Sequence, residues 1–197
     1  GKKNAARWEA KGERETSRIA GTGSCLAGTG VTNDWLSGIM DTSDEWIRTR
    51  TGIRERHLVK EETTTDMAYE AAVRALKQAS VAAEDLELIV VGTVTADHVT
   101  PSAACELQAR LGADRAMAFD INAACSGFLF AIQTADAFLQ AGRFHNAPVN
   151  GPVSLSSILD WSASSSCRPS DLCSGPAAAT LTQTTCRGML HDIHGLY

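Results

Sequence analysis

The chain has 197 residues, of which 44% are hydrophobic, and its formal net charge is −5. This length and apolar content predict one sizeable hydrophobic core, with room for a small appendage. The acidic balance argues against a nucleic-acid-binding protein. No apolar run approaches the length of a membrane span, so we expect no membrane segment.

The cysteines predict a cytoplasmic protein with free thiols rather than a disulfide framework, because the basic start lacks the apolar segment of a secretory signal. They are Cys25, Cys105, Cys125, Cys167, Cys173 and Cys186. A zinc site could be drawn from the C-terminal cysteines and histidines, but their spacing matches no compact pattern of paired ligands. These residues are Cys167, Cys173, Cys186, His191 and His194. We therefore predict no metal site.

The first part of the chain contains little that could build a core. Residues 1–16 are highly charged and are predicted to form a disordered leader or tag. Arg18 to Leu26 is predicted as a strand interrupted by Gly21 and Gly23. The Gly-Thr-Gly pair resembles the start of a dinucleotide motif, but the third glycine is missing and no helix follows directly. A Rossmann-type nucleotide site is therefore excluded.

The next stretch, Asp41 to Arg50, begins with cap-type residues and is predicted to form a short helix. Trp46 and Arg50 are four residues apart, so on a helix they share one face. An indole ring beside a guanidinium suits an adenine ring and its phosphates. The alternative is a half-buried tryptophan next to a surface arginine, and the local sequence alone favours this alternative.

Strands and helices then alternate. Thr63 to Ala79 has the apolar stripe of an amphipathic helix, and the strand predicted over Leu86 to Val94 has a continuously apolar centre. A second helix opens at Pro101-Ser102 and ends at Gly112, and a strand over Ala116 to Ile121 follows. This alternation predicts an α/β layered architecture with a mainly parallel sheet.

Cys125 lies at a predicted turn between that strand and the next helix, Ser126 to Ala141. A cysteine at the start of a helix faces unpaired N–H groups and the positive end of the helix dipole, which favours the thiolate form. The alternative is a small buried residue that fills the core, and the stretch alone leaves the two readings even. Apolar residues occur on every side of this helix, so we expect it to be buried nearly all round.

The alternation of predicted strands and helices stops after Gly142. Ala147 to Pro152 occupies the place of another central strand, but two prolines interrupt it, and proline cannot serve a central strand. We therefore predict no such strand here, and no further strand–helix unit before Tyr197.

The order and spacing of several segments resemble the N-terminal portion of β-ketoacyl-acyl-carrier-protein synthase III, an initiating condensing enzyme of the thiolase superfamily. The segments are Arg18–Ser24, Thr32–Asp34, Asp41–His57, Pro101–Cys105, Asp120–Phe128 and Ile158–Ser162. The resemblance implies the first half of a thiolase-like α/β fold, with a mainly parallel mixed sheet and helices on both faces. Residues 17–180 would form this half, 181–197 its truncated end, and the second half would be largely absent.

The resemblance also implies roles for individual residues. Cys125 would be the nucleophile that takes an acyl group from acyl-coenzyme A as a thioester, before decarboxylative condensation with malonyl-acyl carrier protein. Trp46, Arg50 and Thr42 would contact coenzyme A, and Thr100 would line the acyl pocket. Acyl-coenzyme A would be a substrate, so no cofactor is implied, and the family forms homodimers.

The resemblance leaves other functions open. The family's catalytic histidine and asparagine belong to its second half, so the chain would be impaired in condensation. One alternative is a non-catalytic fragment that binds coenzyme A, a carrier protein or a partner chain, and another is a condensing enzyme that starts polyketide synthesis. The helix after Cys125 would expose apolar surface without a partner half, so we expect self-association.

Overall fold

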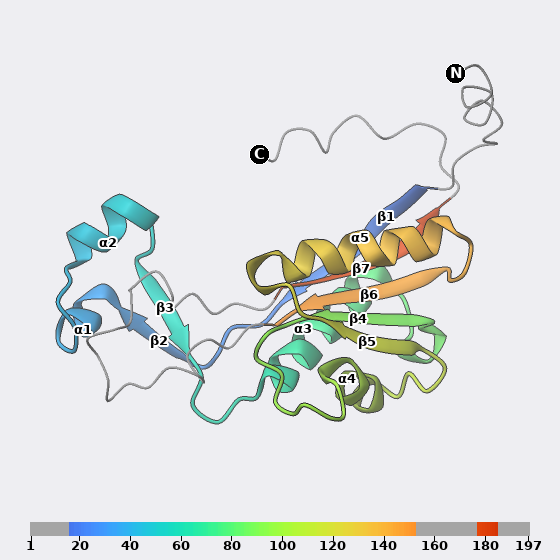
Figure 1. Ribbon diagram of the computed structural model, residues 1–197, viewed down its shortest axis with the longest axis horizontal. Helices are drawn as coiled ribbons and strands as arrows, with labels where there is room; N and C mark the ends of the chain where they lie inside the picture. Colours follow the sequence, from blue (N-terminus) through green and yellow to red (C-terminus); the bar gives the residue numbers. More distant parts are fainter. Residues whose placement is uncertain (1–15, 153–176, 185–197) are drawn as a thin grey trace, which may run out of the picture.

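The structure is a computed structural model that describes residues 16–152 and 177–184. A five-stranded sheet lies between two layers of helices, with α5 on one face and α3 and α4 on the other (Figure 1). The strands are β1 (Thr16–Ser24), β4 (Leu88–Gly92), β5 (Met117–Ile121), β6 (Asn146–Gly151) and β7 (Ala177–Thr184). The helices are α3 (Thr64–Ala79), α4 (Ala103–Leu111) and α5 (Gly127–Gln140).

The strand order is β1-β7-β6-β4-β5. β4 pairs in parallel with both β5 and β6, whereas β7 runs antiparallel to β1 and to β6. The predicted α/β class with a mainly parallel mixed sheet is therefore confirmed. None of the described helices is long and apolar enough to cross a membrane.

The helix ends follow the capping residues in the sequence. Thr63 caps α3 in a capping box with Asp66, and Ser102 accepts a hydrogen bond from the first turn of α4. Gly112 ends α4 in the left-handed conformation, which costs glycine little. Both helices begin and end within two residues of their predicted limits, because these signals are local. A short 3-10 turn, η1 (Ala83–Asp85), leads from α3 to β4.

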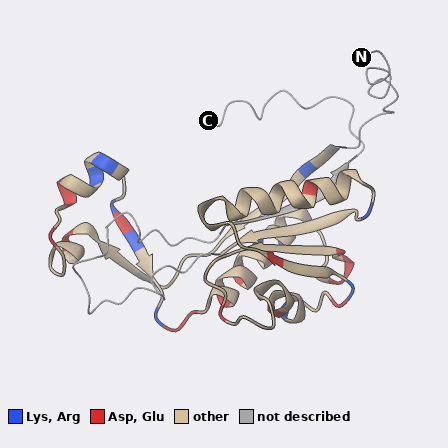
Figure 2. Ribbon diagram, viewed as in Figure 1, with Lys and Arg blue, Asp and Glu red and all other residues tan. Residues whose placement is uncertain are grey.

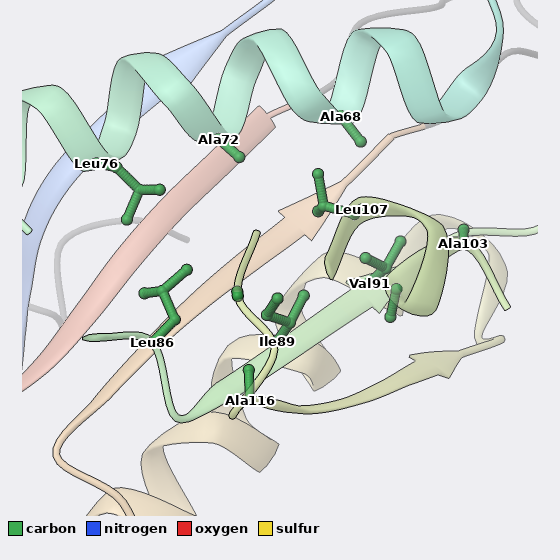
Figure 3. Close-up of a cluster of buried hydrophobic side chains, with 11 residues drawn as sticks. Ala68, Ala72, Leu76, Leu86, Ile89, Val91, Ala103, Leu107 and Ala116 are labelled. Atoms are coloured by element: carbon green, nitrogen blue, oxygen red, sulfur yellow. The ribbon is translucent and has the colours of Figure 1, made fainter. Parts of the chain in front are cut away.

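The larger core lies between the sheet and the α3–α4 layer (Figure 3). Leu86, Ile89 and Val91 on the sheet side meet Leu76 of α3 and Leu107 of α4, and all five are almost completely buried. All five residues of β4 are buried, as expected for a central strand covered on both faces. A second core lies between β4, β6 and α5.

The predicted interruption of the first strand is wrong. β1 is continuous, and Gly21 and Gly23 lie within it, with one register shift against β7 between Ile19 and Gly21. A Cβ atom at Gly21 would stand 2.2 Å from the carbonyl oxygen of Ala75 in α3. The glycines therefore allow the backbone of α3 to approach the strand closely, which a pattern read along one strand does not reveal.

The prediction against a strand near Pro148 is also wrong. β6 contains Pro148 and occupies the middle of the sheet. Its parallel register with β4 comprises only Val90–Val149 and Val91–Asn150, both beyond the proline. Pro148 is paired with Thr180 of the antiparallel neighbour β7, whereas the parallel ladder with β4 begins only at the next residue, so its missing N–H removes no hydrogen bond from that ladder. β7 is a further strand of the C-terminal part, and it continues past residue 180, the predicted limit of the first half.

A small unit precedes α3 in the chain. It comprises β2 (Thr29–Thr32), α1 (Asn33–Ser37), α2 (Asp44–Thr51) and β3 (Glu55–Leu58), with β2 and β3 paired antiparallel. Leu36 and Ile47 form its buried core. The two connections to the main body lie side by side, because the backbone N–H of Gly28 donates to Glu62 Oε1 at 2.8 Å.

The Glu62 contact predicts an acid-dependent loss of stability. Hydrogen bonds from the backbone N–H groups of Lys60 and Gly28 help to lower the pKa of Glu62 from 4.5 to about 2. A carboxylate with a lowered folded-state pKa contributes stability above its unfolded pKa and loses it as the pH falls through the folded value. We expect this contribution to disappear between pH 4.5 and about pH 2.

Urea unfolding of the wild type and of Glu62→Gln at pH 7 and pH 3 measures this effect. The variant is expected to be less stable than the wild type at pH 7, and the difference should shrink at pH 3. Glu61→Gln, at the exposed neighbouring carboxylate, is the matched control and should retain the wild-type pH dependence. Equal pH dependence of Glu62→Gln and the wild type would contradict the assignment.

Candidate active site

Cys125 lies in a short 3-10 turn, η2 (Ala124–Ser126), between the end of β5 and the start of α5. Its side chain is exposed, and Ala124 before it has a φ of 45°. Positive φ is unusual for a residue other than glycine, and such conformations cluster at functional sites. The predicted position of Cys125 at the turn into the helix is confirmed, and its exposure argues against the core-filling alternative.

Two glycines bring this turn close to the sheet. A Cβ atom added at Gly92, the last residue of β4, would lie 2.6 Å from the backbone carbonyl carbon of Gly127 and 2.9 Å from the backbone nitrogen of Phe128. A Cβ at Gly151, the last residue of β6, would lie 2.8 Å from Cβ of Phe128. The first turn of α5 therefore rests on the ends of two central strands, and this contact sets the position of Cys125.

The N-terminus of α5 lacks a side-chain cap. Ser126 at its N-cap makes no side-chain hydrogen bond to the helix, because its backbone is in the right-handed helical region. The other α-helices of the described segments are all capped by a hydroxyl: α1 by Thr32, α2 by Ser43, α3 by Thr63 and α4 by Ser102. No hydroxyl cap therefore occupies the start of α5 beside Cys125, and the N–H of Gly127 donates to the backbone carbonyl of Ala124 instead.

The expectation that α5 is buried nearly all round is wrong for the described chain. Ala131, Ala135 and Leu139 face the sheet and are buried, but Leu129 is 58% exposed and Phe130 is 49% exposed. Figure 2 shows this helix almost entirely in tan. One flank of the helix, beside β5, borders an open groove of about 770 Å³ whose lining includes Ile121, Phe130, Ala137 and Phe138. The exposed apolar surface expected from the sequence is present.

The predicted coenzyme A residues lie on and beside α2. The Arg50 guanidinium carbon is 4.7 Å from the centroid of the Trp46 ring, so the two side chains stack. Trp46 is 42% exposed, which leaves part of its ring open to a ligand. Thr42 lies just before the helix and is half-buried, and its hydroxyl oxygen has no hydrogen-bond partner among the described residues. The predicted shared face of Trp46 and Arg50 is confirmed.

Thr100 lies in the loop between β4 and α4 and is exposed. Two carboxylates fix this loop by accepting hydrogen bonds from helix N-termini, one from α3 and one from α4. Asp97 of the loop accepts hydrogen bonds from the backbone of Thr64 and Thr65 at the start of α3. Asp120 of β5 accepts them from Ala103 and Ala104 at the start of α4. Neither aspartate was predicted to have a role, since each contacts a helix that is distant in the chain.

The turn that carries Cys125 lies at the end of the main body that faces the small unit. In Figure 1 the N-terminal end of α5, which follows Cys125, points toward the small unit that carries α2. The carboxyl ends of β4, β5 and β6 lie at the same end. This is the end of an open α/β sheet at which ligands bind.

The histidines of the described segments make structural contacts. His57 Nδ1 lies 2.7 Å from the carbonyl oxygen of Ala27, and His98 is hydrogen-bonded to Glu106. Residues 16–152 and 177–184 contain no group of three or more side chains that could hold a metal ion. The considered zinc ligands, Cys167, Cys173, Cys186, His191 and His194, lie outside the described residues.

Comparison with known sequences finds similar proteins of one family. Residues 119–192 match the family model of 3-oxoacyl-[acyl-carrier-protein] synthase III. The β-ketoacyl-[acyl-carrier-protein] synthase III of Xylella fastidiosa strain Temecula1 is 56% identical over 156 residues, which cover 79% of this chain and 48% of that protein. The Clostridium botulinum counterpart is 46% identical over 172 residues, covering 87% of this chain and 52% of that protein. The chain thus spans about half the length of these relatives.

Solved structures agree with the sequence matches. The 3-oxoacyl-[acyl-carrier-protein] synthase III of Aquifex aeolicus superposes with a TM-score of 0.81 and 44% identity, covering 86% of this chain and 55% of that one. The priming β-ketosynthase of the R1128 polyketide pathway gives 0.81 and 32% identity, covering 90% and 53%. The chain is therefore β-ketoacyl-acyl-carrier-protein synthase III-like, with a sequence and a thiolase-like fold that match the N-terminal portion of that family.

Proposed function

We propose that Cys125 accepts an acyl group from acyl-coenzyme A, as the first half-reaction of a fatty-acid-initiating condensing enzyme. The sulfur attacks the thioester carbonyl, a new S–C bond forms, and coenzyme A leaves as a thiol with the proton from Cys125. The observation that carries the proposal is the exposed Cys125 in a tight turn directly ahead of α5, whose N-cap is not filled by a side chain.

This geometry suits acyl transfer because negative charge develops on the carbonyl oxygen as the sulfur attacks. The N–H groups of Ser126 and Gly127 already donate to the carbonyl oxygens of Ala123 and Ala124, so the proposed donor to the thioester oxygen is the backbone N–H of Cys125 itself. Preorganised donors of this kind contribute about 3 kcal/mol each to the transition state. The positive end of the α5 dipole acts in the same direction.

Recognition of the donor is assigned to Trp46, Arg50 and Thr42. The stacked Trp46 and Arg50 side chains offer a flat surface for adenine and a fixed positive charge for phosphate. Thr100 is proposed to border the acyl chain. Acyl-coenzyme A is consumed as a substrate, so the proposal requires no cofactor.

The second half-reaction would be condensation with malonyl-acyl carrier protein. Loss of carbon dioxide from the malonyl group gives an enolate, whose carbon attacks the acyl thioester and releases the Cys125 sulfur. By the resemblance, the histidine and asparagine that serve this step belong to the second half of the family. Acyl loading is therefore the step to which the described residues of this chain contribute most directly.

The setting proposed for this reaction is a cytoplasmic homodimer. Its support is the edge position of β5 in the described sheet together with the exposed Met117 on that strand and the exposed Val99 in the adjoining loop. A strand edge bordered by apolar side chains is a surface suited to pairing with a second chain. The similarity to the R1128 priming β-ketosynthase favours polyketide priming as a second candidate function.

Acyl loading can be tested directly by mass spectrometry. After incubation of the full chain with acetyl-coenzyme A, we expect an increase in intact mass by one acetyl group. Peptide mapping under mildly acidic conditions should place the acetyl group on Cys125. An unmodified chain, or acetylation spread over several cysteines, would support the alternative of a non-catalytic binding fragment.

A further inference from the structure

Asn33, the first residue of α1, lies at the centre of the small unit and is only 1% exposed. Its side-chain Nδ2 donates to Asp44 Oδ1 and to the carbonyl oxygen of Ile53, each at 2.8 Å. Its Oδ1 accepts from Arg56 Nη1, also at 2.8 Å, and Arg56 is 3% exposed. One amide therefore joins three other parts of the unit.

These hydrogen bonds hold both ends of α2. Asp44 is the first residue of that helix, and Ile53 follows its C-cap glycine. Arg56 belongs to β3, so the same amide also links the helix to the β2–β3 pair. The Asn33 hydrogen bond is the main cause that lowers the pKa of the Asp44 carboxyl, and so favours the charged acceptor at the helix start.

An isolated helix of eight residues is marginal in water, so the orientation of α2 depends on such contacts. The apolar contact beneath the helix, between Ile47 and Leu36, is close but not directional. Hydrogen bonds are directional and fix an angle. The hydrogen bonds of Asn33 therefore determine the orientation of α2, and with it the direction in which its exposed side faces.

We propose that Asn33 is a positioning residue for nucleotide recognition, because it fixes α2 so that Trp46 and Arg50 present one constant surface. This proposal rests on the proposed role of that pair in binding coenzyme A. Asn33 itself is buried and makes its contacts to Asp44, Ile53 and Arg56. Its effect on the donor passes through the helix.

The test compares two acyl donors that differ in the nucleotide. Acetyl-coenzyme A carries it, whereas acetyl-pantetheine has the same thioester without it. We expect Asn33→Ala to lower the second-order rate of Cys125 acetylation by acetyl-coenzyme A about tenfold. The rate with acetyl-pantetheine should stay within about twofold of the wild type, since that donor does not reach α2.

The matched control is a variant that removes a buried hydrogen bond in the main body, away from α2. Thr64 is 2% exposed, and its hydroxyl donates to the carbonyl oxygen of Thr95 at 2.6 Å in the main body. Thr64→Val should leave the ratio of the two rates unchanged. Asn33→Asp places a carboxylate against Asp44 and should resemble Asn33→Ala, and adding Asp44→Asn to it should restore part of the ratio by re-forming an amide–carboxylate pair.

Calorimetric titration of the wild type and Asn33→Ala with coenzyme A separates this proposal from acyl transfer. An equal loss of rate with both donors, or equal affinity of the two proteins for coenzyme A, would overturn the positioning role. If no donor acetylates the wild type but Asn33→Ala still loses affinity for coenzyme A about tenfold, acyl transfer fails and positioning stands. A wild type that does not bind coenzyme A would overturn both.

Discussion

Replacing Cys125 by alanine is expected to remove the acetyl adduct completely. The sulfur is the atom that would form the thioester, and alanine offers no nucleophile in its place. The methyl group of alanine fits the exposed turn, and the positive φ at Ala124 is left unchanged, so stability should alter by less than about 0.5 kcal/mol. Intact mass after incubation with acetyl-coenzyme A, with thermal unfolding in parallel, measures both.

Two other described thiols provide matched controls. Cys105 also lies in the first turn of a helix, but the N-terminus of α4 is already occupied by Ser102 and by the carboxylate of Asp120. Burial raises the pKa of the Cys25 thiol, which disfavours its nucleophilic form. Cys105→Ala and Cys25→Ala should therefore both retain the adduct. An adduct that survives in Cys125→Ala would refute Cys125 as the nucleophile.

Gly92→Ala is expected to be strongly destabilising. The added methyl group would lie 2.6 Å from backbone atoms of Gly127, and neither backbone can rotate away as a flexible side chain could. We expect a loss of about 3 kcal/mol in the free energy of unfolding, measured in urea. Any fraction that remains folded must shift the first turn of α5, so acetylation of Cys125 should fall about a hundredfold.

Gly30→Ala is the matched control for this change. Gly30 lies in β2, and the nearest atom to an added Cβ is a ring carbon of His57 at 3.8 Å, an ordinary contact distance. This variant should unfold within about 0.5 kcal/mol of the wild type and load acetyl groups normally. Equal stability of Gly92→Ala and Gly30→Ala would show that α5 is not seated on β4 as described.

The parts of the fold that were predicted correctly rest on local signals. The limits of α3 and α4 follow from Thr63, Ser102 and Gly112, each of which acts within one helical turn. The stacking of Trp46 and Arg50 follows from their spacing on one short helix. Cys125 was placed correctly because a strand, a turn and a helix are consecutive there.

The incorrect predictions concern contacts between segments far apart in the sequence. Pro148 lies in β6 one residue before the parallel pairing with β4 begins, so it removes no hydrogen bond from that ladder, although it is paired with Thr180 of β7. The sequence pattern predicts an interruption at Gly21, whereas in the structure this glycine allows the backbone of α3 to approach the strand. The exposure of Leu129 and Phe130 depends on what covers α5, which the pattern of its residues does not specify.

The sequence suggested reactive and ligand-binding side chains for the candidate site, but not the residues that support them. Cys125, Trp46, Arg50 and Thr42 were named, whereas Asn33 and Gly92 were not assigned a role. The role of Asn33 depends on partners 11 and 20 residues away, and that of Gly92 on a contact with the helix that begins at Gly127. Such roles become visible only when the segments are placed together.

The two neighbouring connections of the small unit have a consequence for modularity. The chain leaves the main body near Ala27 and Gly28 and returns near Glu62, and the contacts from Glu62 and His57 hold the exit and the return together. The unit is thus an insertion in the main body. Its two ends are adjacent, and it has its own buried pair of side chains, Leu36 and Ile47. Domain insertion is tolerated where chain ends lie close together. Replacing the small unit by a short glycine-rich linker would yield a shorter protein that keeps the turn with Cys125 and lacks Trp46 and Arg50.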